Sequence, residues 1–268
     1  MLKQLLNTIT QFKRDNRVAV AQVDAIGHSM GGLLVRTAAL FPEFVKGNGL
    51  DAGLVHKLIT IGTPHLGSHL ATELTALPST CAVWFPGTLL SALIPAMNYA
   101  KGFTLDLATD SQMISALLKQ KTVALRTHVI VGVASKEQDK ATSDRIREIG
   151  QSWGCPQIES VLSNGMSGFF AGPSDVVVAA RSQQGIGLGY DSPDAFGVSW
   201  GDRAASIDVV AGVIHSIMPG LFEAGPDELS KTVAKSGMLA YAETPIPNLL
   251  LRLVNSSASS EKFANMLP

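Results

Sequence analysis

The sequence predicts an α/β fold with a mainly parallel sheet covered by helices on both faces. Short apolar runs that resemble strands alternate with amphipathic stretches that resemble helices, which is typical of this class. The clearest pairs are a strand at 18–26 followed by a helix at 33–40, and a strand at 55–61 followed by a helix at 70–77. A chain of 268 residues can bury one sizeable core, so we expect a single domain over residues 1–268.

The remaining elements follow from periodicity and from helix-capping residues. Residues 2–12 carry apolar side chains at helical spacing, which predicts an amphipathic first helix. Asp110 or Ser111 is a suitable N-cap for a helix over 113–118. Further along the chain we expect a core strand at 128–133, a last strand at 206–213, and helices at 227–236 and 248–254.

Two segments interrupt this alternation. Residues 78–103 form a candidate apolar cap or lid, with buried core as the alternative, because no charged residue occurs between Glu73 and Lys101. Prolines at 78, 86 and 95 argue against a continuous membrane-spanning helix there. Residues 134–172 are polar and contain three separate glycines, which predicts an irregular surface excursion.

Composition excludes several classes of function. The 21 basic and 22 acidic residues give a net charge of −1, so no broad field favours nucleic acid, and we expect no nucleic-acid partner. Cys81 and Cys155 are too few for a disulfide framework. The first residues lack the apolar core and cleavage site of a secretory signal. Neither observation fixes the compartment, and a cytoplasmic location is the default expectation.

The stretch from Gly27 to Gly32, Gly-His-Ser-Met-Gly-Gly, lies between the strand at 18–26 and the helix at 33–40. A strand, a sharp turn and a helix in this order are the context that a nucleophilic serine requires. Ser29 is therefore the candidate nucleophile. The positions two residues before and after such a serine come so close together that only small residues fit, and Gly27 and Gly31 occupy them. The following helix directs its N-terminal N–H groups at the same point, which makes Met30 N–H the candidate oxyanion donor.

A serine nucleophile needs a general base and an orienting carboxylate. In chains with such an elbow the order is serine, acid, histidine, and His215 is the only histidine late enough. Asp175 is our choice for the acid because it lies between a turn and a valine run. Glu137 and Asp139 are the rivals, whereas Asp208 is expected to lie inside the last strand.

His65, His69 and Glu73 are spaced by four residues, as metal ligands on one helix face would be. Pro64 places His65 before the helix begins, and no second ligand group is in view. We therefore expect no metal and no cofactor.

Four motifs together resemble the α/β-hydrolase lipases, especially the GPI-inositol-deacylase-like and triacylglycerol-lipase branches. They are residues 27–32, residues 59–68 (Ile-Thr-Ile-Gly-Thr-Pro-His-Leu-Gly-Ser), residues 174–177 (Ser-Asp-Val-Val), and His215 with Ser216. The resemblance spans about residues 1 to 220. It implies Ser29 as nucleophile, Asp175 as acid, His215 as base and Met30 as oxyanion donor. It also implies a small-molecule or lipid ester substrate, transient contact with a lipid surface, and no cofactor.

Two departures from the family pattern affect these expectations. Val176 follows the acid, where such lipases often have glycine. Only 28 residues precede Ser29, whereas the fold normally has several strands upstream and takes its second oxyanion N–H from the loop after the third. The sequence therefore predicts an N-terminally truncated α/β-hydrolase, with the missing part supplied upstream or by a partner.

The function expected from these residues is hydrolysis of carboxylic esters of acyl chains through an acyl-enzyme on Ser29. Acyl transfer with the same three residues is one alternative, because an alcohol can replace water at the acyl-enzyme. A catalytically silent interaction module without a complete oxyanion hole is the other.

Overall fold

The centre of the computed structural model is a sheet of four parallel strands with a short antiparallel addition. The strands are β1 (Val23–His28), β2 (Val55–Ile61), β3 (Arg126–Val133) and β4 (Ile207–Ala211), in the spatial order β1-β2-β3-β4. β5 (Ala264–Asn265) pairs with β3. The structure describes residues 2–20, 22–41, 44, 53–76, 105–119, 125–152, 165–185, 207–215, 236–239, 244–260 and 262–265. The prediction of a mainly parallel sheet is confirmed.

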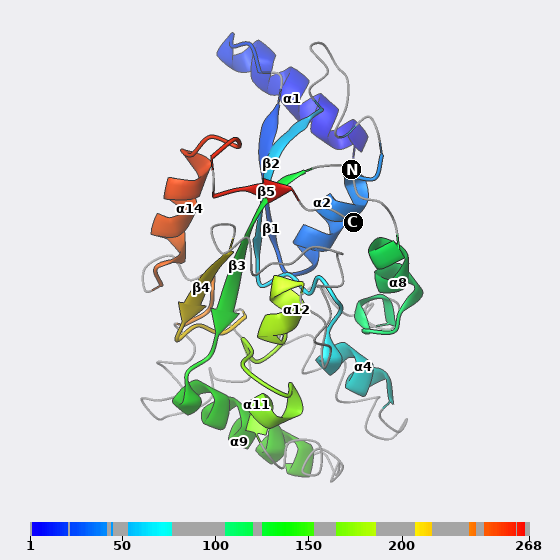
Figure 1. The fold of residues 1–268 in the computed structure, drawn as a ribbon, viewed down its shortest axis with the longest axis vertical. Helices are drawn as coiled ribbons and strands as arrows, with labels where there is room; N and C mark the ends of the chain where they lie inside the picture. The colour runs from blue at the N-terminus through cyan, green and yellow to red at the C-terminus, as the bar shows by residue number, and fades with distance from the viewer. Residues whose placement is uncertain are drawn as a thin grey trace.

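Helices pack on both faces of this sheet (Figure 1). Ile246, Leu249 and Leu253 of α14 join one hydrophobic cluster with Ile59 and Ile130. On the opposite face α2 packs over β2, and α12 packs over β3. The described helices are α1 (Leu2–Asn16), α2 (Met30–Ala38), α4 (His69–Ala76), α8 (Gln112–Lys119), α9 (Lys136–Ser152), α11 (Gly165–Phe169), α12 (Ala180–Gln184) and α14 (Ile246–Val254).

A second helical layer lies outside α2. Leu33 of α2, Ala71 of α4 and Ile114 of α8 are buried in one cluster. Ser111 caps α8, since its Oγ accepts a hydrogen bond from the backbone N–H of Ile114 at 3.1 Å. Ser111 is thus the helix N-cap that was expected at Asp110 or Ser111. Helices α4 and α8 both form close to the predicted residues.

Two sequence-based expectations differ from the structure. β1 begins at Val23 and continues to His28, later than the expected 18–26. Residues 134–172 were expected to be irregular, but they contain the 17-residue helix α9, at the foot of the molecule in Figure 1. The buried side of α9 is largely polar, with Gln138, Thr142 and Ser143 all less than a tenth exposed, which is why hydrophobic periodicity did not reveal it. The expected apolar cap at 78–103 lies entirely outside the described residues, as does most of the expected helix at 227–236.

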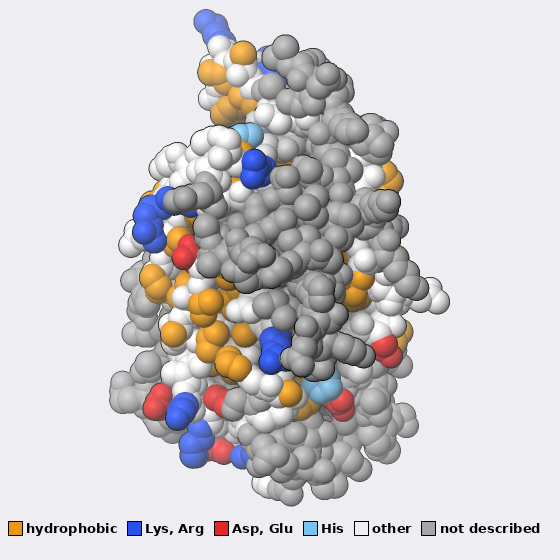
Figure 2. Space-filling view, in the orientation of Figure 1, with side chains coloured by type: hydrophobic (Ala, Val, Ile, Leu, Met, Phe, Trp, Pro, Cys, Tyr) orange, Lys and Arg blue, Asp and Glu red, His pale blue; other side chains and the backbone are white. Residues whose placement is uncertain are grey.

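The outer part of β4 is apolar and exposed. Val209 is 58% exposed, and Figure 2 shows hydrophobic side chains gathered over β4 and the end of β3. No described helix is long and apolar enough to cross a membrane.

A buried lysine joins β2 to the C-terminal end of α14. Lys57 is 1% exposed, and its Nζ donates to the carbonyl oxygens of Leu253 at 3.0 Å, Val254 at 2.7 Å and Ser256. Its ammonium also lies 3.3 Å from Asp24 Oδ2. A cation at a helix C-terminus satisfies carbonyls that have no partner within the helix and interacts favourably with the helix dipole. Lys57 therefore fixes α14 against the sheet.

Lys57→Met should lower the free energy of unfolding by about 2–4 kcal/mol, because it leaves buried carbonyls and a partly buried carboxylate without their cation. Urea denaturation followed by circular dichroism measures this change. The matched control is Lys140→Met on α9, where the side chain is 78% exposed and the expected change is below about 0.5 kcal/mol. Equal effects of the two substitutions would contradict the role given to Lys57.

A second buried network holds the turn after β2 against α2. His65 is fully buried, Arg36 Nη1 donates to His65 Nδ1 at 3.2 Å, and the same nitrogen donates to the His65 carbonyl oxygen at 3.2 Å. Because Nδ1 accepts, Nε2 carries the proton and donates to Thr60 Oγ1, 3.2 Å away. Burial, followed by the positive charge of Arg36, lowers the pKa of His65 well below its ordinary value. The network thus requires a neutral imidazole.

This lowered pKa predicts that stability falls as the solution becomes more acidic. Below about pH 6.5 the unfolded state takes up a proton on His65 that the folded state does not, so the free energy of unfolding decreases as pH drops. Urea denaturation at pH 7.5 and pH 5.0 should show a smaller decrease for His65→Gln than for the unsubstituted protein. The same decrease in both proteins would show that His65 titrates alike in the folded and unfolded states.

Candidate active site

Ser29 occupies a strained turn between β1 and α2. Its φ of 53° and ψ of −131° are rare for a residue with a side chain. The turn is held at both sides by backbone bonds: Ser29 N–H donates to the carbonyl of Ile61 at 2.9 Å, and Gly32 N–H donates to the carbonyl of Ser29 at 3.1 Å. These contacts place the serine at the carboxyl end of the sheet.

The positions around this turn that require glycine are Gly27 and Gly32, whereas Gly27 and Gly31 were expected. A Cβ at Gly27 would lie 2.5 Å from the Gly32 nitrogen, and a Cβ at Gly32 would lie 2.2 Å from Thr63 Oγ1. Both positions therefore exclude a larger side chain. The expectation for Gly31 was wrong, because a Cβ there meets nothing within 4 Å. Gly32 was missed because its neighbour, Thr63, comes from a distant part of the sequence.

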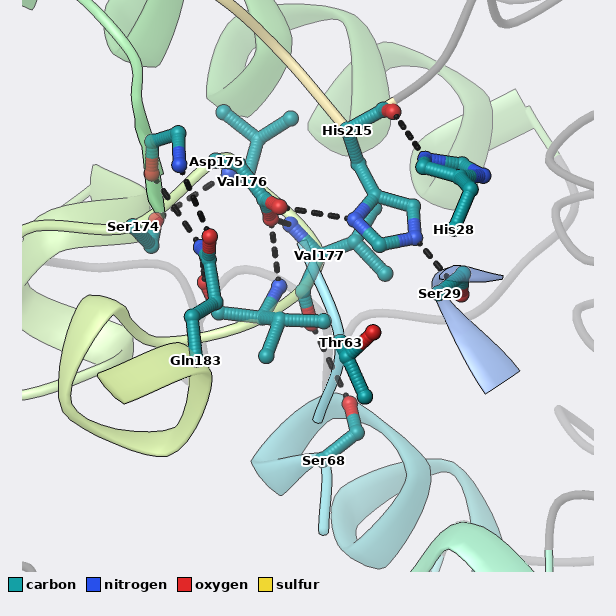
Figure 3. Close-up of polar contacts among 12 residues, drawn as sticks. His28, Ser29, Thr63, Ser68, Ser174, Asp175, Val176, Val177, Gln183 and His215 are labelled. Atoms are coloured by element: carbon teal, nitrogen blue, oxygen red, sulfur yellow. Dashed lines mark hydrogen bonds and ion pairs between the residues drawn. The ribbon is translucent and has the colours of Figure 1, made fainter. Parts of the chain in front are cut away.

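Three of the predicted side chains form one hydrogen-bonded chain (Figure 3). His215 Nε2 lies 2.8 Å from Ser29 Oγ, and His215 Nδ1 lies 2.7 Å from Asp175 Oδ2. A carboxylate accepts, so Nδ1 carries a proton and Nε2 is left to accept from the serine hydroxyl. Asp175 is fully buried and His215 is 4% exposed. The fourth predicted residue, Met30, is the first residue of α2, and its N–H has no acceptor within its own helix.

Backbone groups fix the Asp175 carboxylate. Its Oδ1 accepts from the N–H groups of Val177 at 3.1 Å and Val178 at 2.7 Å, while Oδ2 faces His215. Val176, between the acid and these donors, has a φ of 68° and is 2% exposed. A left-handed backbone favours glycine, which accounts for the glycine expected at this position. Here a buried valine adopts the same conformation.

Gln183 supports the loop that bears Asp175, a role that the sequence did not reveal. Its Oε1 accepts from Gly132 N–H at 2.8 Å, and its Nε2 donates to the carbonyls of Gly132 at 3.1 Å and Val178 at 2.9 Å. Figure 3 shows this fully buried amide beside the loop that bears Asp175. Gln183 thus connects β3 to the acid loop. Its helix, α12, has only five residues, too few for a periodic signal.

His28 lies against the other side of His215. The ring centroids of the two histidines are 4.8 Å apart, and His28 Nε2 lies 2.9 Å from the His215 carbonyl oxygen. Burial, followed by the proximity of His215, lowers the pKa of His28 to about 4. His28 is therefore neutral at physiological pH.

The rival acids lie elsewhere. Glu137 is on the exposed surface of α9, and Asp139 Oδ1 accepts from the backbone N–H of Met166 at 2.8 Å. Asp208 lies in β4, where its carboxylate is 3.1 Å from His128 Nε2. Only Asp175, among these carboxylates, contacts His215 in the described structure.

The histidines considered as metal ligands are engaged in other contacts. His65 contacts Arg36 and Thr60, while His69 lies 3.6 Å from Glu73 on α4. Within the described ranges no group of three His, Cys, Asp or Glu residues is arranged to hold a metal ion.

β2 is the strand that pairs with β1 among those described. The glycine that directly follows β2, Gly62, lies beside Asp175 and His215: a Cβ added there would be 3.1 Å from Asp175 Oδ2 and from His215 Nδ1. A second oxyanion donor for Ser29 is therefore not identified in the described part of the chain.

Comparisons with known proteins find one family model and several solved structures that are similar to this chain. Residues 1–86 match the family model of the PGAP1-like alpha/beta domain. Two solved structures that match are the lipase of Staphylococcus hyicus, at 14% identity and a TM-score of 0.43, and EstA from Clostridium botulinum, at 17% and 0.39. The first match covers 87% of this chain and 68% of the lipase, and the second covers 80% of this chain and 64% of EstA. A comparison with curated proteins finds no significant match. The chain therefore has an α/β architecture built on a parallel sheet, and its first 86 residues are similar to the PGAP1-like alpha/beta domain.

Proposed function

We propose that this protein is a serine hydrolase that cleaves carboxylic esters of acyl chains. The observation that supports the proposal most directly is the hydrogen-bonded chain from Ser29 through His215 to Asp175. It lies at the carboxyl end of a parallel sheet, where α/β-hydrolases carry their nucleophile. The acyl-ester substrate class is suggested by the resemblance of residues 27–32, 59–68, 174–177 and 215–216 to the α/β-hydrolase lipases.

Each residue has one role in the proposed reaction. His215 Nε2 takes the proton of the Ser29 hydroxyl as Oγ attacks the acyl carbonyl carbon. Asp175 keeps the His215 ring in the required tautomer and stabilises the imidazolium that forms. The backbone N–H of Met30 donates to the oxyanion of the tetrahedral intermediate.

The intermediate then collapses to an acyl-enzyme. The protonated His215 gives its proton to the departing alcohol, and the acyl group remains on Ser29 Oγ. A water molecule, deprotonated by His215, attacks this acyl-enzyme and releases the carboxylic acid. The proposal also includes a second oxyanion donor from outside the described residues. The apolar segment 78–100 is the proposed wall for the acyl chain.

Ser29→Ala should abolish labelling by a fluorophosphonate probe and lower kcat on nitrophenyl esters by about 10⁴–10⁶-fold, since no other group replaces the nucleophile. Labelling is read by mass spectrometry of the intact protein, and kcat from release of nitrophenol across short and long acyl chains. The control is Ser259→Ala, an exposed serine with no expected effect. Labelling that persists in Ser29→Ala would contradict the assignment.

Gly62 has a specific place in this geometry. It follows β2 directly, has a φ of 56°, and donates its N–H to the carbonyl of Ile130 at 3.0 Å. An added Cβ would lie 3.1 Å from both Asp175 Oδ2 and His215 Nδ1, and 3.0 Å from Met238 Sδ. A methyl group at this position would press on the acid and the base at the point where they meet.

We therefore expect Gly62→Ala to lower kcat by about 10- to 100-fold, because small displacements of reacting groups have effects of this size. Gly212→Ala is the matched control, since Gly212 also has a positive φ, 74°, but a Cβ there meets nothing within 4 Å. Both variants carry the backbone strain of alanine in a left-handed conformation. Equal kcat values for the two variants would show that contact with the acid and base has no effect.

A further inference from the structure

The main chain of His215 is held from two directions. Its N–H donates to the backbone carbonyl of Asp175 at 2.8 Å. Its carbonyl lies 2.9 Å from His28 Nε2, the contact drawn at the upper right of Figure 3. The first bond links the base to the acid loop. The second links it to the strand that bears the nucleophile, because His28 directly precedes Ser29.

We propose that His28 is a positioning residue for the reaction: its ring N–H holds the His215 backbone so that the base stays in reach of Ser29 Oγ. This inference rests on the proposed function. It assigns a task to a residue that the reaction itself does not use. His28 acts on the base at the backbone carbonyl of His215, to which its ring N–H donates.

The direction of the hydrogen bond fixes the tautomer of His28. A carbonyl oxygen can only accept, so the proton must be on His28 Nε2. The bond is local to the site, since the strand residue that makes it is adjacent to the serine in sequence. The bond therefore ties the main chain of the base to the strand residue next to the nucleophile.

The charge of His28 also suits this position. The two imidazole rings are 4.8 Å apart with an interplanar angle of 39°. During the reaction His215 becomes positively charged, and a second cation beside it would oppose that step. Burial keeps the pKa of His28 near 4, so it remains a neutral donor while His215 takes and returns the proton.

The test compares a donor-free ring with a neutral donor at this position. His28→Phe removes the N–H, and His28→Gln replaces it with an amide N–H of similar reach. For each variant we would measure the rate constant of fluorophosphonate labelling, kcat and KM on one nitrophenyl ester, and the melting temperature. His56→Phe is the matched control, because His56 lies on the neighbouring strand with its side chain 43% exposed.

His28→Phe should lower kcat and the labelling rate constant by about 10- to 100-fold with KM within about threefold, because a displaced base slows the chemical step without removing substrate contacts. In His28→Gln both rate constants should stay within about threefold of those of the unsubstituted protein. In His56→Phe they should equal those of the unsubstituted protein. An unchanged labelling rate in folded His28→Phe would overturn the inference. So would a loss in folded His28→Gln as large as that in His28→Phe.

Two further measurements separate the possible failures. Absence of labelling in the unsubstituted protein would refute the proposed function itself, whatever the variants do. If His28→Phe does not fold, nitrogen-15 NMR of the unsubstituted protein decides between the tautomers of His28. A neutral ring protonated at Nε2 supports the inference, and a proton on Nδ1 overturns it.

Discussion

The turn at Ser29 is the constraint on which the site depends. A parallel strand must reverse into a helix within one residue, so the serine adopts a φ of 53°. Gly27 must lack a side chain for β1 and α2 to approach, and Gly32 must lack one because Thr63 lies against it. The close contact of Gly32 with Thr63 joins the elbow to the turn after β2. The elbow, the acid loop and the base loop then meet at one edge of the sheet, although they lie far apart in sequence.

Much of the fold could be predicted because its two central strands, β2 and β3, are mostly buried. β2 was expected at 55–61 and occurs there, since β-branched and other apolar residues, which favour strands, dominate this stretch. α9 was missed because its buried side carries Gln138, Thr142 and Ser143, so periodicity in hydrophobicity gives no signal. β5 has two residues and is formed only through contact with β3.

The site residues that could be predicted are those that chain order and neighbouring sequence identify. Chain order and the valine run led to His215 and Asp175, and the structure brings both to Ser29. Gln183 and Gly62 were not found, because what each does depends on neighbours that are distant in sequence. Their contacts with Gly132 and with the acid and base exist only after the sheet has formed.

Val176 shows that a β-branched residue can follow the acid in a left-handed backbone conformation. A β-branched residue in the left-handed region carries a backbone penalty of about 1–3 kcal/mol, whereas its buried side chain contributes packing of comparable size. Glycine would have neither the backbone penalty nor the packing contribution of the side chain, so valine and glycine should give a similar free energy of unfolding at this position. Search patterns that demand glycine after the acid will therefore overlook chains of this kind. A pattern defined by backbone handedness would retrieve them.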